Sequence, residues 1–195
     1  MKKNIITISR EFGSGGRTIG KKLAEKLGIP YYDREIIIKV AEESGLDQKF
    51  IEEMGEYAPS KNFFSYAFVG RSIDGLSTND YIWNLQCNII RDLAEKGPCV
   101  IVGRCADYIL RNRDDVLNVF IHADKEYRAE RIVREYGERP KSPIDRVEEK
   151  DKKRSINYQY YTDRKWGIVQ NYDVSLNSGV IGIDNCVDII ANIVK

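Results

Sequence analysis

Short apolar runs alternate along the chain with segments of helical periodicity. In Thr18–Gly28, Ile19, Leu23 and Leu27 recur at i, i+4 and i+8, which places them on one side of a helix that ends at the glycine. Cys99–Val102 is a continuous apolar run, which suits a central parallel strand covered on both faces. The alternation predicts an α/β fold of three layers with a parallel sheet. Strands are expected at 4–9, 99–102, 116–121 and 173–177, a short extended piece at 30–33, and helices at 18–28, 35–44, 80–96 and a closing segment that includes 187–194.

Two segments depart from this alternation. From 46 to about 78 the pattern loosens around an aromatic run at 63–68, which predicts an inserted helical subdomain over about 46–79. Between Lys125 and Arg154, 11 basic and 8 acidic residues make 19 of 30 residues charged, so this stretch is not expected in the core. It is interpreted as part of a lid over about 125–164, or alternatively as solvated helices with i,i+4 ion pairs. The stretches 1–45, 80–124 and 165–195 would then form the core of a single domain.

Composition limits the classes of function. The chain has 31 Lys and Arg against 30 Asp and Glu, a net charge of +1, so we expect no bulk binding to nucleic acid or membranes. No run approaches the ~18 apolar residues that span a bilayer, and the start does not resemble a signal peptide, so we expect a cytoplasmic protein. The four cysteines lack C-x-x-C spacing and are expected to be reduced packing thiols. One histidine, His122, makes His-based hydrolase chemistry a poor fit.

The strongest local signal is the glycine-rich segment between the first expected strand and the first expected helix. Glycine amides and a helix N-terminus together favour a bound phosphate. The string G-x-x-x-x-G-K-[ST] of ordinary phosphate loops is not met, because Gly16 stands at the lysine position. Arg17 or Lys21 could supply the missing cation, and the Thr18 hydroxyl could reach Mg²⁺; close packing of helix on strand is the alternative reason for the glycines. The residues expected at the phosphates are Gly13, Ser14, Gly15, Gly16, Arg17 and Thr18.

Further polar residues are expected at the same edge of the sheet. Arg104 directly follows the apolar run 99–102, and ligands of parallel sheets bind outside the carboxyl ends of the strands. Asp33 ends the second extended piece, where its carboxylate could accept hydrogen bonds from a sugar or base. For each of these residues alone, a structural salt bridge is the alternative. Three arginines spaced by three residues could close on a transferring phosphoryl group from one side of a helix: Arg128, Arg131 and Arg134.

Taken in order, these motifs resemble the cytidylate kinase-like family of phosphate-loop nucleoside monophosphate kinases. The opening string 8–16 and the closing strings around 160–161, 166–167 and 171–179 are typical of that family, and the resemblance covers essentially the whole chain. It implies a P-loop NTPase fold with a helical acceptor-binding insertion and an Arg-rich lid. It also implies a phosphotransferase that uses ATP and Mg²⁺ and acts on a small nucleotide, most simply a nucleoside monophosphate.

The resemblance implies roles for single residues as well. It implies a lid that contains Arg128 and Arg131, and we expect these two arginines and Arg17 to act on the transferring phosphoryl group. It places the acceptor nucleotide at Asp33, Lys39, Arg104, Asp151 and Arg154, with Asp151 at the ribose and Arg154 at a phosphate. Cytidylate kinases carry Gly-Arg-Asp where this chain has Gly103-Arg104-Cys105, and a small-residue turn where it has Arg34-Glu35-Ile36, so the acceptor stays open. A kinase of another metabolite, or a nucleotide-binding regulatory protein without turnover, are the alternatives.

Overall fold

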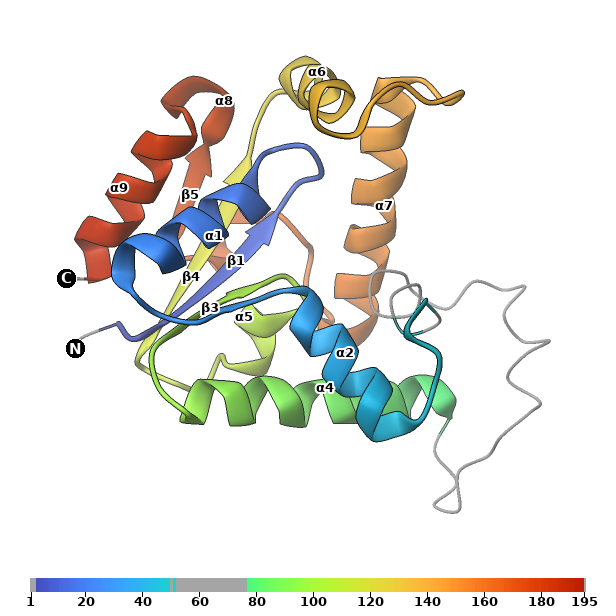
Figure 1. The fold of residues 1–195 in the computed structure, drawn as a ribbon, viewed down its shortest axis with the longest axis vertical. Helices are drawn as coiled ribbons and strands as arrows, with labels where there is room; N and C mark the ends of the chain where they lie inside the picture. The colour runs from blue at the N-terminus through green and yellow to red at the C-terminus, as the bar shows by residue number, and fades with distance from the viewer. Residues whose placement is uncertain (1–2, 50, 52–76, 195) are drawn as a thin grey trace.

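The computed structural model describes residues 3–49, 51 and 77–194, which build a parallel sheet with helices on both faces (Figure 1). Its five strands lie in the order β2-β3-β1-β4-β5, and each neighbouring pair is parallel. The predicted three-layer α/β fold is therefore confirmed. The strands are β1 (Ile5–Arg10), β2 (Tyr31–Tyr32), β3 (Cys99–Val102), β4 (Val116–His122) and β5 (Val174–Asn177). The helices are α1 (Gly16–Leu27), α2 (Arg34–Ser44), α4 (Thr78–Glu95), α5 (Ala106–Ile109), α6 (Lys125–Tyr136), α7 (Pro143–Thr162), α8 (Ser178–Ile181) and α9 (Ile183–Val194), with a 3₁₀ turn η2 (Val169–Asn171).

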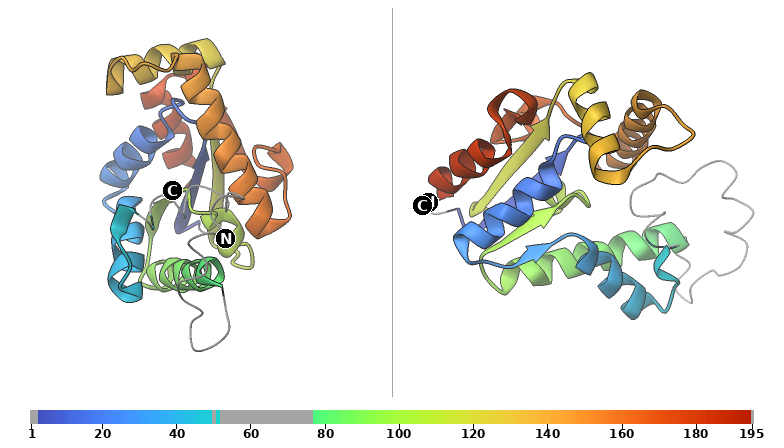
Figure 2. Two further views of the ribbon diagram at one scale, coloured as in Figure 1. Left: turned by 90° about the vertical axis from the view of Figure 1, so that its right-hand side faces the viewer. Right: turned by 45° about the horizontal axis from the view of Figure 1, so that its top comes forward.

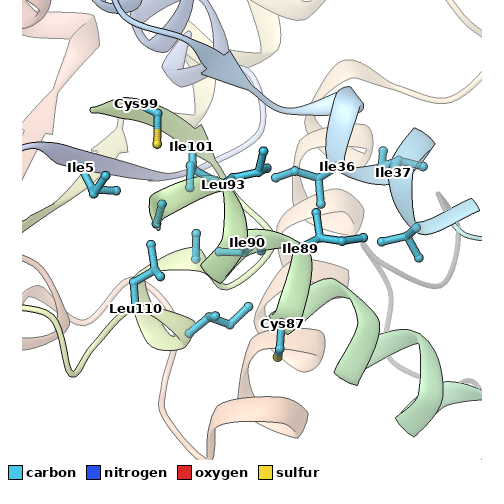
Figure 3. Packing of buried hydrophobic residues seen from close by; sticks show 14 of the residues in the cluster. Ile5, Ile36, Ile37, Cys87, Ile89, Ile90, Leu93, Cys99, Ile101 and Leu110 are labelled. Carbon is cyan, nitrogen blue, oxygen red and sulfur yellow. The ribbon is translucent and has the colours of Figure 1, made fainter. Parts of the chain in front are cut away.

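The central strands are buried on both faces, as the continuous apolar run in β3 predicts. Successive side chains of a strand point to opposite faces, so Cys99 and Ile101 join one apolar cluster while Val100 and Val102 join the other. The first cluster packs against α2, α4 and α5, and Figure 3 shows Ile101 facing Leu93 and Ile90 of α4. The second packs against α1 and α9. The sheet is thus held rigidly between two helical layers, which fixes the loops at its ends.

The helix boundaries shift by a few residues from those expected. Helix α4 begins at Thr78 rather than at Asp80, because the Ser77 hydroxyl caps it by accepting a hydrogen bond of 3.1 Å from the Asp80 amide. Helix α1 begins at Gly16, two residues earlier than expected. All four cysteines are buried free thiols, as predicted. None of the helices in the described part of the chain is long and apolar enough to cross a bilayer.

Helices α6 and α7 lie side by side beyond the carboxyl ends of β1 and β4 (Figure 2). The expectation that 125–154 stays out of the core is wrong in part. Ile132 of α6 and Val147 of α7 are fully buried, and the arginines Arg128, Arg131 and Arg146 are buried with them. A few apolar side chains at helical spacing suffice to seat the two helices, although most of their residues are charged. The expected insertion at 46–79, with its aromatic run, lies almost wholly outside the described residues.

Candidate active site

The glycine-rich segment forms an open loop between β1 and α1. Gly13 and Gly15 have φ of +84° and +82°, and Gly15 is the N-cap of α1, so the turn requires residues that tolerate left-handed backbone. Ser14 closes the loop from inside: its hydroxyl donates to the Glu11 carbonyl at 2.9 Å, and its amide donates to the same carbonyl at 3.3 Å. Within the described residues, the amides of Gly13, Gly15 and Gly16 donate no hydrogen bond to the protein, so they can donate to an anion.

Helix α6 places its buried arginines against this loop. Arg131 donates from Nη2 to the Thr18 hydroxyl at 3.0 Å, so it reaches the start of α1. Arg128 donates from Nε to the Ala123 carbonyl at 2.8 Å and from Nη1 to the Phe12 carbonyl at 3.2 Å. Both arginines are therefore in place at the loop. Arg134 points elsewhere: its side chain is 68% exposed, because a spacing of six residues from Arg128 turns it away from the loop.

Asp151 of α7 ties the loop to α6. One carboxylate oxygen accepts a hydrogen bond of 2.7 Å from the Phe12 amide, and the other forms a charge-assisted hydrogen bond with Arg128. Glu11 also lies 3.2 Å from Arg128. Burial raises the pKa of the Glu11 carboxyl, and the Arg128 charge opposes that rise. Both oxygens of Asp151 are thus engaged inside the protein, and a contact of Asp151 with a ribose stays a prediction.

Arg17 and Asp33 are paired across the rim of the site. The guanidinium binds the Asp33 carboxylate through Nε and through Nη2, the latter at 3.3 Å. The Asp33 side chain is 6% exposed, whereas that of Arg17 is 51% exposed, so the arginine covers the carboxylate from the solvent side. This contact links the start of α1 to the end of β2, between the loop and the expected acceptor side.

A tight left-handed turn follows β3 and carries Arg104 into the site. Gly103, Arg104 and Cys105 have φ of +73°, +58° and +54°, an unfavourable conformation for the two residues with side chains. The turn lines an inner cavity of about 40 Å³, which we define by Arg10, Arg104 and Arg154 together with Ser9 and Asn157. Three guanidinium groups around one small cavity form the local cation cluster that a near-neutral chain needs to hold an anion.

A buried carboxylate, that of Asp107, binds two of the side chains that line the inner cavity. Asp107 of α5 accepts a hydrogen bond of 2.6 Å from the Tyr158 hydroxyl and one of 3.4 Å from the Ser9 hydroxyl. Burial raises the pKa of the Asp107 carboxyl, while the hydrogen bonds from Tyr158 and Ser9 lower it. Burial likewise raises the pKa of the Tyr158 hydroxyl, so it stays protonated and donates. This network fixes two side chains that line the cavity.

Two further cavities adjoin the inner one. The loop cavity, about 70 Å³, lies at Gly13, Gly15, Gly16 and Thr18, and Arg131 lines it. The outer cavity, about 560 Å³, extends between the loop and the ends of α6 and α7, a volume in the range of ligand pockets. Among the described residues, its lining holds one carboxylate, that of Glu149, and six cations: Arg17, Arg139, Lys141, Arg146, Lys150 and Arg154.

Most, but not all, of the expected site residues line these cavities. Gly13, Gly15, Gly16, Arg17, Thr18, Arg104, Arg131 and Arg154 line the three adjoining cavities. Lys39, half-buried on α2, lines none of them. Sequence reasoning missed Arg10 and Asp107. Arg10 could have been found, because it continues the alternation of Ile6 and Ile8 and must share their face of the sheet.

The loop also fits a magnesium nucleotide. Magnesium is usually held by one or two protein oxygens together with substrate phosphates, rather than by a cage of protein side chains. The described residues contain no group of three or more His, Cys, Asp or Glu side chains that could hold a metal. The Thr18 hydroxyl, at the start of α1 beside the loop amides, is the protein oxygen that would contact the ion.

The chain is similar to known proteins along most of its length. A sequence model of the cytidylate kinase-like family matches residues 5–180. A protein of Archaeoglobus fulgidus named cytidylate kinase is 29% identical over 197 residues, covering 97% of this chain and 94% of its own length. The crystal structure of an uncharacterized protein from Eubacterium ventriosum matches with a TM-score of 0.73 at 30% identity, covering 97% of each chain. Shikimate kinase from Bacteroides thetaiotaomicron matches at 17% identity with a TM-score of 0.57 over 97% of each chain, which confirms the P-loop kinase fold alone.

Proposed function

Because the chain belongs to the cytidylate kinase-like family, we propose that it transfers the γ-phosphoryl group of ATP to the phosphate of a nucleoside monophosphate. The observation that carries this proposal is the junction of two anion sites. The loop cavity offers backbone amides and Arg131, the inner cavity offers Arg10, Arg104 and Arg154, and the two cavities share residues. Donor and acceptor phosphates bound there would lie next to each other.

The transfer itself asks little of the protein beyond position and charge. An acceptor phosphate oxygen, already ionised near neutral pH, attacks the γ-phosphorus and forms the new P–O bond. The bond from that phosphorus to the β,γ-bridging oxygen breaks, and ADP leaves with this oxygen and the electron pair. No proton has to be removed from the nucleophile, which agrees with a site rich in arginine. When bound, magnesium would supply further neutralisation of the phosphate charges.

Each group in the site has a part in this scheme. We expect Arg104 to hold the acceptor phosphate, and the loop amides with Arg17 and Arg131 to hold the phosphates of ATP. Asp33, held by Arg17, would orient the acceptor. Arg128 would act mainly by holding the loop through the Phe12 carbonyl, because its guanidinium is already surrounded by protein oxygens. A direct contact of Arg128 with the phosphoryl group, and a contact of Lys39 or Asp151 with the acceptor, stay predictions.

The test is an acceptor panel. ADP formation from ATP is measured with CMP, UMP, AMP and GMP in turn, with and without Mg²⁺, and the diphosphate product is identified. We expect turnover with at least one acceptor, dependent on Mg²⁺. Arg104→Met should raise KM for that acceptor at least ~10-fold, as loss of a charged phosphate contact predicts. Arg91→Met is the matched control, since Arg91 lies on the exposed side of α4. Nucleotide binding without turnover on any acceptor would favour the regulatory alternative.

A further inference from the structure

An ordinary phosphate loop has a glycine and a lysine at the positions that Arg10 and Gly16 occupy here, so the cationic residue and the glycine have changed places. When the string G-x-x-x-x-G-K-[ST] is placed so that its second glycine falls on Gly15, its first glycine falls on Arg10 and its lysine on Gly16. We propose that this exchange is functional, and that Arg10 is a further catalytic residue that supplies the phosphate-binding cation from the end of β1. The inference deepens the proposed function and rests on it for the identity of the reaction.

The two positions are coupled by direct steric contact. A Cβ atom at Gly16 would lie 2.5 Å from the Cβ of Arg10, which is closer than such atoms approach in proteins, and 3.1 Å from its Cγ. The Cβ of Ile121, the partner of Arg10 on β4, would lie 3.3 Å away. Any side chain at position 10 therefore requires glycine at position 16. A lysine at the usual loop position is therefore excluded by Arg10, and the cation has to come from another position.

The strand directs Arg10 into the site. Ile6 and Ile8 point to the face covered by α1, and Arg10, two residues further, points the same way, across the first turn of α1. Its guanidinium ends against Gly103, the first residue of the left-handed turn that carries Arg104. Arg154 holds the backbone at this point by donating from Nη1 to the Arg10 carbonyl at 3.3 Å.

This position lies between the two phosphate sites. Arg10 lines the loop cavity and also the inner cavity that contains Arg104. A guanidinium there can donate to oxygens of the phosphoryl group both before and after transfer, where charge shifts from one phosphate to the other. Arg17 is placed differently, because it lines the loop and outer cavities from the exposed rim and is held by Asp33. Arg10 is thus the better substitute for the loop lysine.

The steric coupling is tested by thermal unfolding. Gly16→Ala should lower Tm by roughly 5 °C, and should do so equally in an Arg10→Ala background, because the Cβ of residue 10 remains. In an Arg10→Gly background the same change should be neutral or stabilising, since alanine favours a helix more than glycine does. An equal loss of Tm in all three backgrounds would overturn the coupling.

The catalytic part is tested by activity and by binding. Arg10→Met should lower kcat about 10²-fold with the panel's best acceptor, and Arg10→Lys should lose less. The double change Arg10→Gly with Gly16→Lys should recover at least ~10-fold over Arg10→Gly alone. An unchanged kcat in Arg10→Met, or no recovery in the double variant, would overturn the assignment. Arg91→Met again serves as the control.

A second readout separates this inference from the proposed function. Inorganic pyrophosphate should bind the native protein, and its Kd, measured by calorimetry, should rise about 10-fold in Arg10→Met. If the native protein phosphorylates no acceptor, the proposed function fails, and the pyrophosphate measurement then decides the role of Arg10 alone. Equal Kd values for the native protein and Arg10→Met would overturn that role regardless of activity.

Discussion

The arginines of this site differ in what they already bind. Arg128 is almost wholly enclosed and binds two backbone carbonyls and Asp151, so its charge serves the loop. Within the described residues, Arg131 binds a hydroxyl of the loop and the exposed Glu135, at 3.8 Å, and can turn to a phosphate at little cost. Arg17 is half exposed and binds the buried carboxylate of Asp33. The burial and the partners of each guanidinium therefore indicate whether that arginine holds the loop or is available to bind the ligand.

The first prediction concerns Arg17. Arg17→Ala should lower kcat/KM for ATP by roughly 10²-fold, or about 2.7 kcal/mol of transition-state stabilisation, because a cation at the loop is lost. Steady-state kinetics at fixed acceptor measures it. Asp33→Asn, which leaves Arg17 charged, should mainly raise KM for the acceptor. A native rate in Arg17→Ala would assign the loop cation entirely to other residues, with Arg10 first among them.

At the scale of elements, α7 joins the loop to α6 through Asp151. Asp151 holds the Phe12 amide and Arg128, and Arg154, one turn further, holds the Arg10 carbonyl. The outer part of α7 has a different kind of contact: Glu149 binds Lys141 and Lys153, whose hydrogen bonds lower the pKa of its carboxyl to about 2. These latter pairs are exposed, so they contribute little to stability.

The second prediction compares two carboxylates of α7. Asp151→Ala should lower the free energy of unfolding by about 3 kcal/mol, because it removes one of the two carboxylates beside the buried Arg128 and leaves the Phe12 amide without its acceptor. Asp151→Asn should lose less, since the amide oxygen can still accept from the Phe12 amide. Glu148→Ala removes an exposed pair with Lys125 and should change stability by less than ~1 kcal/mol. Urea unfolding of the three variants measures these differences; equal losses at both positions would contradict the structural role given to Asp151.

At the scale of the whole molecule, the order of the strands assembles the site. β1 lies between β3 and β4, so the loop after β1, the turn after β3 and the start of α6 after β4 meet at one edge of the sheet (Figure 1). The sheet and its two helical layers are apolar and close-packed, while α6 and α7 rest on few apolar side chains. The molecule thus combines a rigid sheet and its two helical layers with a helix pair, α6 and α7, that is held mainly by polar contacts.

The third prediction follows from this contrast. In the absence of ligand, backbone amides of 125–154 should exchange faster than those of the sheet, and ATP with Mg²⁺ should slow their exchange. The slowing should be largest at 134–142, where the side chains are mostly exposed, and smaller around the buried Arg128 and Ile132. Amides of α9 should not change. Hydrogen exchange measured by mass spectrometry decides it; equal protection with and without bound nucleotide would make this segment a fixed part of the surface rather than a lid.

The sequence by itself determined the elements and the place of the phosphate loop. Periodicity is a local property, so the runs at 99–102 and 116–121 and the stripe of Ile19, Leu23 and Leu27 were enough to predict the layers. The glycines and Thr18 marked the loop, because its backbone chemistry depends on adjacent residues. Residue order and spacing also carried the resemblance to the family.

Only the tertiary structure decided which cations share the site. Arg10 and Gly103 are far apart in sequence, and their contact depends on how β1 and β3 pair. Burial of Arg128 and Arg131 within a charge-rich segment depends on Asp151 and Thr18 lying opposite them, which composition does not encode. A side chain's charge is fixed by its residue type, whereas its partners and exposure are set by packing between distant segments. For that reason the sequence was enough to locate the loop. The steric link between the arginine at position 10 and the glycine at position 16 became apparent only from the tertiary structure.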